Sequence, residues 1–355
     1  MLSELRVGII GAGEIAKDRH IPALLALKDK VIITAICDVN QAKAEKVARK
    51  FAIPHFFKEY EDMFSTMALE AVVICTPNKF HADITIAALK AGAHVLCEKP
   101  MAMNRLEGQK MINAAKKADK LLSVGYHYRY TDAARMAKAA ISEQKIGDPL
   151  VTRIRALRRR KVPGWGVFTN KELQGGGSLI DYGCHFIDLA FWLLNHPVPV
   201  EVIGKTYNRL STTPNQVNEW GTFDYQNFNV DDHVSSYITF KDGSSLLFEC
   251  SWAANIKEDQ MHLSISGAEG GLSVYPFEVY RPQENEYQLS EENADEYHNE
   301  DQAGYRQMSN FVNSCLGTES LLVEAEEALK VNQIIEAIYE SNDKGSSVRL
   351  EDYER

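Results

Sequence analysis

The chain has 355 residues, 45% hydrophobic and 25% charged, a balance typical of a globular protein large enough for two domains with separate cores. Its formal net charge of -10 would repel a phosphate backbone, so we do not expect nucleic acid as a partner. The sequence has neither an apolar run of membrane-spanning length nor a signal-peptide pattern, so we expect no membrane association and predict a cytoplasmic location.

The six cysteines, at positions 37, 75, 97, 184, 250 and 315, lie mostly at the ends of apolar runs, without close pairs and without histidine partners at metal-ligand spacing. A chain of this length can build a core without cross-links. We therefore expect free core cysteines rather than a disulfide framework.

The first predicted strand is the apolar run "RVGII" (6–10), followed directly by "GAGEIA" (11–16) and a helical segment. This is the G-x-G-x-x-A pattern of a dinucleotide-binding turn. Gly11 permits the tight turn, Gly13 lets a pyrophosphate approach the backbone, and Ala16 packs the helix closely on the sheet. Glu14 and Ile15 then supply backbone N–H groups at the positive end of the helix.

A second apolar strand, "VIITAICD" (31–38), ends in Asp38, at the distance where a carboxylate accepts hydrogen bonds from the adenosine ribose. A carboxylate there repels a 2′-phosphate, and Val39 and Asn40 supply no cation to hold one. The sequence therefore favours NAD over NADP.

Two further strands, 70–77 and 93–100, flank a helix over 79–92, and this alternation predicts a parallel sheet. Ligands lie outside the carboxyl ends of such strands, so the residues at these ends should meet at one cleft. They are Thr76, Pro77, Asn78, Glu98 and Lys99. Pro100 keeps Lys99 extended at the strand end, although "CEKP" is also compatible with a surface turn.

After residue 125 the pattern changes, which places a domain boundary between 1–124 and 125–355. A helix over 133–141 is followed by runs with partial alternation that predict an antiparallel sheet, and Asp242-Gly243 marks a hairpin. We expect the acidic stretch 284–301 to form a solvated loop and 321–342 a final helix. The predicted strands cover 150–157, 233–240, 245–254, 261–267 and 272–280.

The segment "GGGSLIDYGCHFIDLAFWLLNHP" (175–197) predicts a helix capped by Ser178 and stopped by Pro197. Its residues are apolar nearly all round, so the helix should be buried. Asp181, His185 and Asp188 nevertheless form one polar stripe at helical spacing. Because unpaired polar groups are costly in an apolar interior, this stripe should face partners, water or a ligand.

Structural explanations of the stripe remain open. Asp181 could complete an acidic variant of a capping box with Ser178, and His185 could be a satisfied structural histidine. Asp188 is best explained as a support for His185. A third neutral or thiolate ligand is missing, so we predict no metal site.

Taken together, "GAGEIA", "CDVN", "TPNKFHADITIAALKAGAHVLCEKPMA" and "GGGSLIDYGCHFIDLAFWL" resemble the Gfo/Idh/MocA oxidoreductases over essentially the whole chain. The resemblance implies an α/β fold, with an N-terminal doubly wound Rossmann sheet and a C-terminal α+β domain whose large, mostly antiparallel open sheet pairs subunits into homodimers or homotetramers. It also implies a catalytic trio of Lys99, Asp181 and His185, with Lys99 coming from the first domain and the other two from the second.

The function that follows is hydride transfer between a nicotinamide cofactor and a ring hydroxyl or keto group of a sugar, sugar derivative or cyclitol. His185 suits the general acid/base, Lys99 would stabilise the alkoxide, and Asp181 would bind substrate or tune its neighbours. The expected cofactor contacts are Gly11, Gly13, Glu14, Ile15, Asp38, Thr76, Pro77, Asn78, His81, Glu98 and Lys99.

Candidate substrate residues are Tyr126, His127 and Trp165, with Asp232 and His233 as weaker ones. The basic run Arg158–Lys161 is compatible with anion binding and with a solvated loop. Two other functions remain open: glycoside cleavage with only transient redox chemistry, and a non-catalytic NAD-binding sensor.

Overall fold

The computed structural model describes residues 4–283, 286–291 and 300–353. The chain divides into two compact units. The first comprises Met1–Tyr130 and Glu300–Asn332, and the second comprises Thr131–Asn299 and Gln333–Arg355. The helices of the described ranges include none that combines the length and apolarity needed to cross a membrane.

The first unit is built on a six-stranded sheet in the order β3-β2-β1-β4-β5-β6, with every pair parallel, which confirms the predicted doubly wound sheet. Its strands are β1 Leu5–Ile10, β2 Val31–Cys37, β3 His55–Phe57, β4 Ala71–Ile74, β5 His94–Cys97 and β6 Leu122–Val124. The strands are apolar runs because helices cover both faces of such a sheet.

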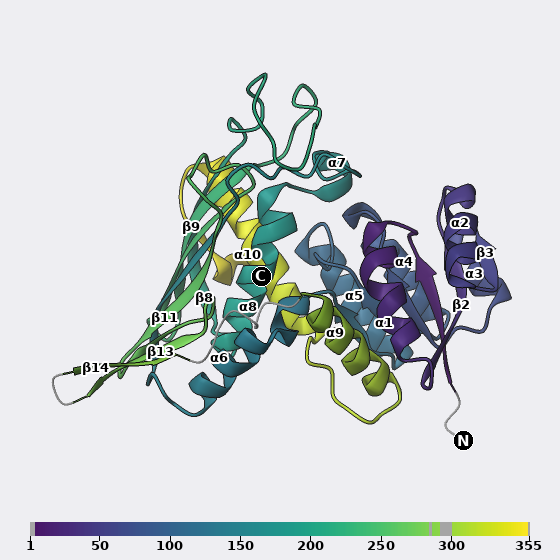
Figure 1. Ribbon diagram of the computed structural model, residues 1–355, viewed down its shortest axis with the longest axis horizontal. Coiled ribbons are helices and arrows are strands. Elements are labelled where there is room, and N and C mark those ends of the chain that lie inside the picture. The colour runs from purple at the N-terminus through teal and green to yellow at the C-terminus, as the bar shows by residue number, and fades with distance from the viewer. Residues whose placement is uncertain (1–3, 284–285, 292–299, 354–355) are drawn as a thin grey trace. The chain divides into compact units, whose positions relative to one another are not determined.

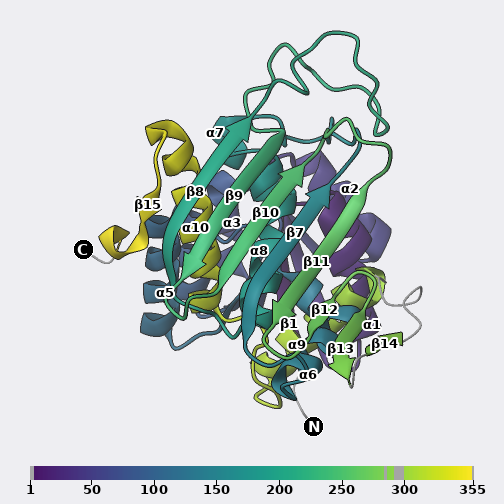
Figure 2. The same ribbon diagram turned by 90° about the vertical axis from the view of Figure 1, so that its left-hand side faces the viewer.

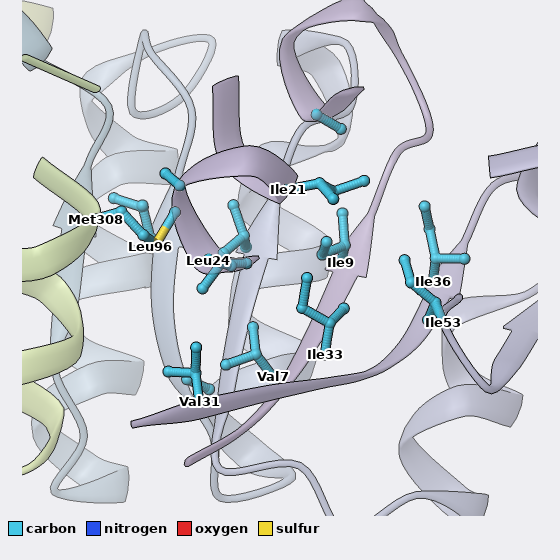
Figure 3. Close-up of a cluster of buried hydrophobic side chains, with 14 of the residues drawn as sticks. Val7, Ile9, Ile21, Leu24, Val31, Ile33, Ile36, Ile53, Leu96 and Met308 are labelled. Atoms are coloured by element: carbon cyan, nitrogen blue, oxygen red, sulfur yellow. The ribbon is translucent and has the colours of Figure 1, made fainter. Parts of the chain in front are cut away.

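Helices connect these strands and are labelled in Figure 1. They are α1 Ile21–Ala26, preceded by a π-helical turn at Ala16–His20, α2 Gln41–Phe51, α3 Tyr60–Thr66, α4 His81–Lys90 and α5 Arg105–Ala118. Helix α9 Glu300–Cys315 comes much later in the chain and also belongs to this unit. Figure 3 shows one of the cores between sheet and helices, where Val7 and Ile9 of β1 meet Leu24 of α1 and Ile33 of β2. Met308, which is distant in sequence, belongs to the same cluster because α9 packs against α1.

The second unit contains a nine-stranded sheet in the order β14-β13-β12-β11-β7-β10-β9-β8-β15. All neighbours are antiparallel except β7 and β10, so the mostly antiparallel sheet is confirmed. Its strands are β7 Pro149–Leu157, β8 Pro199–Tyr207, β9 His233–Phe240, β10 Ser245–Ser251, β11 Gln260–Gly267, β12 Gly271–Ser273, β13 Glu278–Gln283, β14 Glu286–Glu291 and β15 Val348–Arg349.

Helices of this unit lie behind one face of the sheet, and the broad strands β7 to β11 present the other face to the viewer in Figure 2. Along β9 and β10, even-numbered side chains are buried and odd-numbered ones are partly or fully exposed, except for the buried Ser251 at the end of β10. The helices are α6 Asp132–Ser142, α7 Lys171–Gln174, α8 Cys184–Leu193 and the last part of α10 Ala325–Lys344.

Four sequence expectations need correction. Strand β8 was not predicted, the run 272–280 is interrupted by a turn between β12 and β13, and α10 begins at Ala325 rather than 321. The acidic stretch contains strand β14 over 286–291 and is therefore not a simple loop, while its residues 284–285 and 292–299 lie outside the described residues. The predicted hairpin is confirmed: Gly243 adopts φ +88° between β9 and β10.

The sequence pattern also gave no sign that residues 300–332 belong to the first compact unit. Helix α9 packs there against α1 and the short 3-10 turn His127–Tyr130. Arg129 of that turn is fully buried and donates a hydrogen bond to the carbonyl of Leu322. Contacts between distant segments therefore bring this part of the chain back to the first unit.

Candidate active site

The turn after β1 is shaped by two glycines with different environments. Gly11 adopts φ +97°, and a Cβ there would lie 2.5 Å from the carbonyl oxygen of Cys75. Gly13 does not have a positive φ, and a Cβ there would meet nothing within 4 Å. Gly11 is therefore required by the protein itself, whereas the backbone at Gly13 leaves open space into which a ligand can fit. Ala16 is fully buried, as the predicted close packing requires.

Asp38 follows β2 and holds the glycine turn. One carboxylate oxygen accepts from Ala12 N–H at 2.9 Å, and the other accepts from Asn40 N–H at 2.9 Å. The ammonium of Lys43 lies 3.8 Å from the first of these oxygens. The sequence pattern did not reveal Lys43, because only the two residues directly after Asp38, Val39 and Asn40, were considered when a nearby cation was sought.

His81 opens α4 and is completely buried. Its Nδ1 lies 2.8 Å from the carbonyl oxygen of Pro100, and its Nε2 lies 2.9 Å from that of Thr76. Burial lowers the pKa of His81, although both carbonyl oxygens favour its proton. The side chain thus links the ends of β4 and β5 and fixes the segment that carries Lys99.

Glu98, directly before Lys99, is buried against His20 of the first helix. The His20 Nε2 lies 2.7 Å from its Oε1, and the backbone N–H of Lys99 donates to its Oε2 at 3.1 Å. Burial raises the pKa of Glu98, but the His20 hydrogen bond and the charges of His20, Arg19 and Lys99 outweigh it and lower this pKa to about 2. The segment before Lys99 is therefore anchored by an ionised carboxylate.

The other strand-end candidates lie where a cofactor could reach them. Glu14 is exposed and Ile15 half-buried at the start of the helix, Pro77 and Lys99 are half-buried, and Asn78 is buried. The Thr76 hydroxyl is buried and has no hydrogen-bond partner among the described residues. This hydroxyl, the open space at Gly13 and the carboxylate of Asp38 fit the requirements of a bound dinucleotide.

In the second unit, the helix with the polar stripe begins with a π-helical turn, Leu179–Gly183, and continues as α8. Every residue of α8 is buried, as predicted, including His185 and Asp188. Asp181 is the most exposed member of the stripe, with 16% of its side chain accessible.

Asp231, which the sequence analysis missed, caps this helix. Its carboxylate accepts from the backbone N–H groups of Gly177 and Leu179, from the Ser178 hydroxyl and from the Tyr339 hydroxyl. The expected Ser178 cap is wrong, because Ser178 has helical backbone angles and its side chain makes no capping bond. A Cβ at Gly177 would overlap the carbonyl oxygen of Asp231, which explains a glycine before the helix.

Asp181 is held from two other segments rather than by a capping box. Its Oδ2 accepts a hydrogen bond from the indole N–H of Trp252 at 3.1 Å and lies 3.7 Å from Nη1 of Arg158. Trp252, also missed, is fully buried and directly follows β10. The structure therefore excludes the capping-box explanation of Asp181.

The remaining candidates have different surroundings. In the first unit, Tyr126 and His127 are buried, and the His127 Nδ1 lies 3.2 Å from a guanidinium nitrogen of Arg19. In the second unit, Trp165 is 47% exposed and its ring centroid lies 5.3 Å from that of Trp220. No set of three or more His, Cys, Asp or Glu side chains suited to a metal ion occurs in the described part of the chain.

The two weaker candidates lie at the start of β9, with Asp232 directly before the strand and His233 as its first residue. Asp232 is buried and accepts from the backbone N–H of Ser211 at 2.6 Å. Burial, with a further contribution from Asp231, raises its pKa to about 6 despite the hydrogen bonds from Ser211. His233 lies 3.3 Å from Glu249 on the neighbouring strand, and burial lowers its pKa.

The basic run is also fixed by contacts. Arg159 and Lys161 form ion pairs with Glu219, and Arg160 donates to the carbonyl of Val217. The run is therefore joined to a second loop, while Arg159 remains exposed to solvent.

Two family models match the chain. One, described as an oxidoreductase family with an NAD-binding Rossmann fold, covers residues 5–126, and the other, described as the GFO/IDH/MocA C-terminal domain, covers residues 134–273.

Named relatives cover different shares of the sequence. The chain is 34% identical to a D-glucoside 3-dehydrogenase of Escherichia coli over 351 residues, 98% of each protein. It is 32% identical to an inositol 2-dehydrogenase of Salmonella typhimurium over 193 residues, which cover 54% of this chain and 55% of that protein. A levoglucosan dehydrogenase solved with NADH has the same fold, with a TM-score of 0.84, 24% identity and coverage of 98% of this chain and 99% of that one.

Proposed function

The chain belongs to the Gfo/Idh/MocA family of NAD-dependent sugar and cyclitol dehydrogenases, and we propose on this premise that it oxidises or reduces a ring carbon of a sugar or sugar derivative. The observation that carries the proposal is the trio of Lys99, Asp181 and His185, which this family uses for catalysis and this chain retains. Because the glucoside dehydrogenase relative spans nearly the whole chain, a glucoside is the preferred substrate class. Residues 1–124 would bind the cofactor, and residues 125–355 would bind substrate and form oligomers.

The proposed chemistry assigns a different task to each residue of the trio. His185 takes the proton from the substrate hydroxyl during oxidation and returns it during reduction, a task suited to imidazole near neutral pH. The Lys99 ammonium stabilises the alkoxide as it forms, and Asp181 accepts a hydrogen bond from the substrate. A bound nicotinamide supplies hydride chemistry.

The proposed cofactor is NAD rather than NADP, because Asp38 presents a carboxylate where a 2′-phosphate would need a cation. Lys43 lies beside this carboxylate and partly offsets its charge. We expect kcat/KM to be higher with NAD, and Asp38→Ser to lower the NAD preference by about tenfold or more. A wild-type enzyme that works as well with NADP would contradict this assignment.

The decisive experiment is a screen of the purified protein with NAD and a panel of glucosides, aldoses, anhydrosugars and inositols. We expect NADH to form with at least one of them, and most readily with a glucoside. Cleavage of a glycoside without NADH accumulation would contradict the proposal and support transient redox chemistry. If the protein binds NAD but oxidises no compound of the panel, and if Lys99→Met and His185→Ala leave NAD binding unchanged, the result would support a non-catalytic NAD-binding sensor.

We also propose a cytoplasmic location and a homodimer or homotetramer, and the outer face of the second sheet supports the proposed assembly. Ile203, Tyr237 and Leu247 are paired across β8, β9 and β10 and are 51%, 40% and 44% exposed. Arg153 follows Leu247 in the same row. Such an exposed apolar row suits a second copy of the same face. Light scattering should show Leu247→Glu dissociating, whereas Leu106→Glu, on α5, should leave the assembly intact.

A further inference from the structure

Arg158, the first residue of the basic run, is held between two aromatic rings. Its guanidinium carbon lies 4.0 Å from the ring centroid of Tyr182 and 4.5 Å from that of Trp220. Only 17% of the side chain is exposed. A planar cation between two ring faces is favourably placed by cation–π attraction and has little freedom to move. The position of this positive charge is therefore fixed by packing.

The fixed charge is directed at Asp181. Nη1 of Arg158 is buried and lies 3.7 Å from Oδ2 of Asp181, and it has no hydrogen-bond acceptor among the described residues. The same carboxylate oxygen is already bound by the indole N–H of Trp252. Arg158 therefore acts on Asp181 through charge at close range, while Trp252 supplies the direct hydrogen bond.

The rest of the basic run holds this arrangement in place. Glu219 N–H donates to the carbonyl of Arg160 at 2.8 Å. The Asn218 side chain accepts from Val162 N–H at 2.8 Å and donates to the Val162 carbonyl at 2.9 Å. With the Arg159–Glu219 ion pair, these bonds join residues 217–219 to 159–162. Trp220 is the next residue, so the joined loops place its ring on Arg158.

We propose that Arg158 is a positioning residue for Asp181, fixed by Tyr182 and Trp220 so that the Asp181 carboxylate stays ionised and oriented toward substrate. This role rests on the proposed function, in which Asp181 accepts a hydrogen bond from the sugar. A guanidinium within about 4 to 6 Å favours the charged form of a carboxylate, and only a charged, oriented carboxylate is a strong acceptor. The other residues of the basic run then hold two loops together, and Arg158 is the residue of the run with a functional role.

The test compares Arg158→Ala, Arg158→Lys and the control Arg209→Ala, which removes an exposed arginine from the loop that leads to Trp220. We expect Arg158→Ala to lower kcat/KM by about 10- to 100-fold, less than the loss of a group that contacts the substrate. Arg158→Lys should keep part of the activity because it retains the charge without the planar stack. Arg209→Ala should match the wild type.

A second measurement adds guanidinium at concentrations well below those that denature the protein. If Arg158 had a purely structural role, this addition would not restore activity. Guanidinium should fit between Tyr182 and Trp220 in Arg158→Ala and restore activity in a saturable manner, with no such effect on Arg209→Ala. Equal activity in wild type and Arg158→Ala, or a loss that does not respond to guanidinium in a variant with wild-type melting, would overturn the proposal. Absence of activity in the wild type across the sugar panel would overturn the proposed function as well.

Discussion

In the first unit, most candidate residues follow the carboxyl ends of neighbouring parallel strands, whereas in the second unit the catalytic candidates lie on one helix whose neighbours come from distant segments. Asp38 follows β2, Thr76 follows β4 and Lys99 follows β5 of one sheet. Asp181, by contrast, is held by Trp252 and Arg158, and its helix is capped by Asp231. A parallel sheet gathers its strand ends by topology, while the helix depends on particular long-range side chains.

The two units also bury carboxylates with opposite consequences for pH. Glu98 lies with His20, Arg19 and Lys99 and has a pKa of about 2, whereas burial and Asp231 raise the pKa of Asp232 to about 6. Positive neighbours favour the ionised form, and burial with a negative neighbour disfavours it. The first unit therefore stabilises the ionised form of Glu98. In the second unit, the ionised form of Asp232 lowers the stability of the fold.

The largest expected effect concerns the proposed catalytic trio of Lys99, Asp181 and His185. Lys99→Met and His185→Ala should each lower kcat by about 10²- to 10⁴-fold, because each removes a proton-handling or alkoxide-stabilising group. Steady-state kinetics with a substrate from the screen measures this effect, and calorimetry should show NAD binding retained by His185→Ala. Lys90→Met, an exposed change at the end of α4, is the control. Wild-type kcat in His185→Ala would contradict its assignment as acid/base.

The dependence of the second unit on distant contacts predicts a large loss of stability in Asp231→Ala. The change leaves two backbone N–H groups and two hydroxyls without their shared acceptor, so unfolding should become easier by about 3 to 5 kcal/mol. Tyr339→Phe, which removes one of the four donors, should cost about 1 kcal/mol. Denaturant unfolding measures both, with exposed Asp224→Ala as a control of small effect. Equal losses in Asp231→Ala and Asp224→Ala would exclude the proposed cap.

The opposite carboxylates predict opposite pH dependence. The depressed pKa of Glu98 contributes stability that is present above about pH 4.5 and is lost as pH falls toward about 2, so Glu98→Gln should lose about 3 kcal/mol at neutral pH and less in acid. The raised pKa of Asp232 costs stability as pH rises from about 4 to 6, so Asp232→Asn should gain about 3 kcal/mol above pH 6. Unfolding measured at several pH values tests both signs, and parallel curves for both variants and the wild type would contradict them.

The smallest expected effect separates the two glycines of the dinucleotide turn. Gly11→Ala should cost about 1 to 3 kcal/mol of stability and weaken NAD binding, because its φ is positive and its Cβ meets the Cys75 carbonyl. Gly13→Ala should leave stability within about 0.5 kcal/mol and weaken only NAD binding, since a Cβ there meets no protein atom. Unfolding and NAD titration are measured together. Unchanged NAD affinity in Gly13→Ala would show that the cofactor does not approach there.

The sequence predicted the strand-end residues of the first unit because apolar runs separated by helices specify a parallel sheet, and that sheet brings Asp38 and Thr76 to one edge. It also predicted that the helix around His185 is buried. It did not predict Asp231 as the cap, because Leu179 and Asp231 are 52 positions apart and their hydrogen bond leaves no periodic signal in the sequence. For the same reason, His20 and Trp252 were not connected to Glu98 and Asp181.

By itself, the sequence determined the fold class, the dinucleotide turn and the chemical types in the trio, since these depend on local pattern and residue identity. The tertiary structure decided how the stripe residues are held and why the glycines before them are needed: Gly177 leaves space for the Asp231 carbonyl. It also showed that the basic run fastens one loop to another and places Arg158 on Trp220. Hydrogen bonds and ring contacts between distant segments require specific positions in space, and sequence periodicity carries no information about those positions.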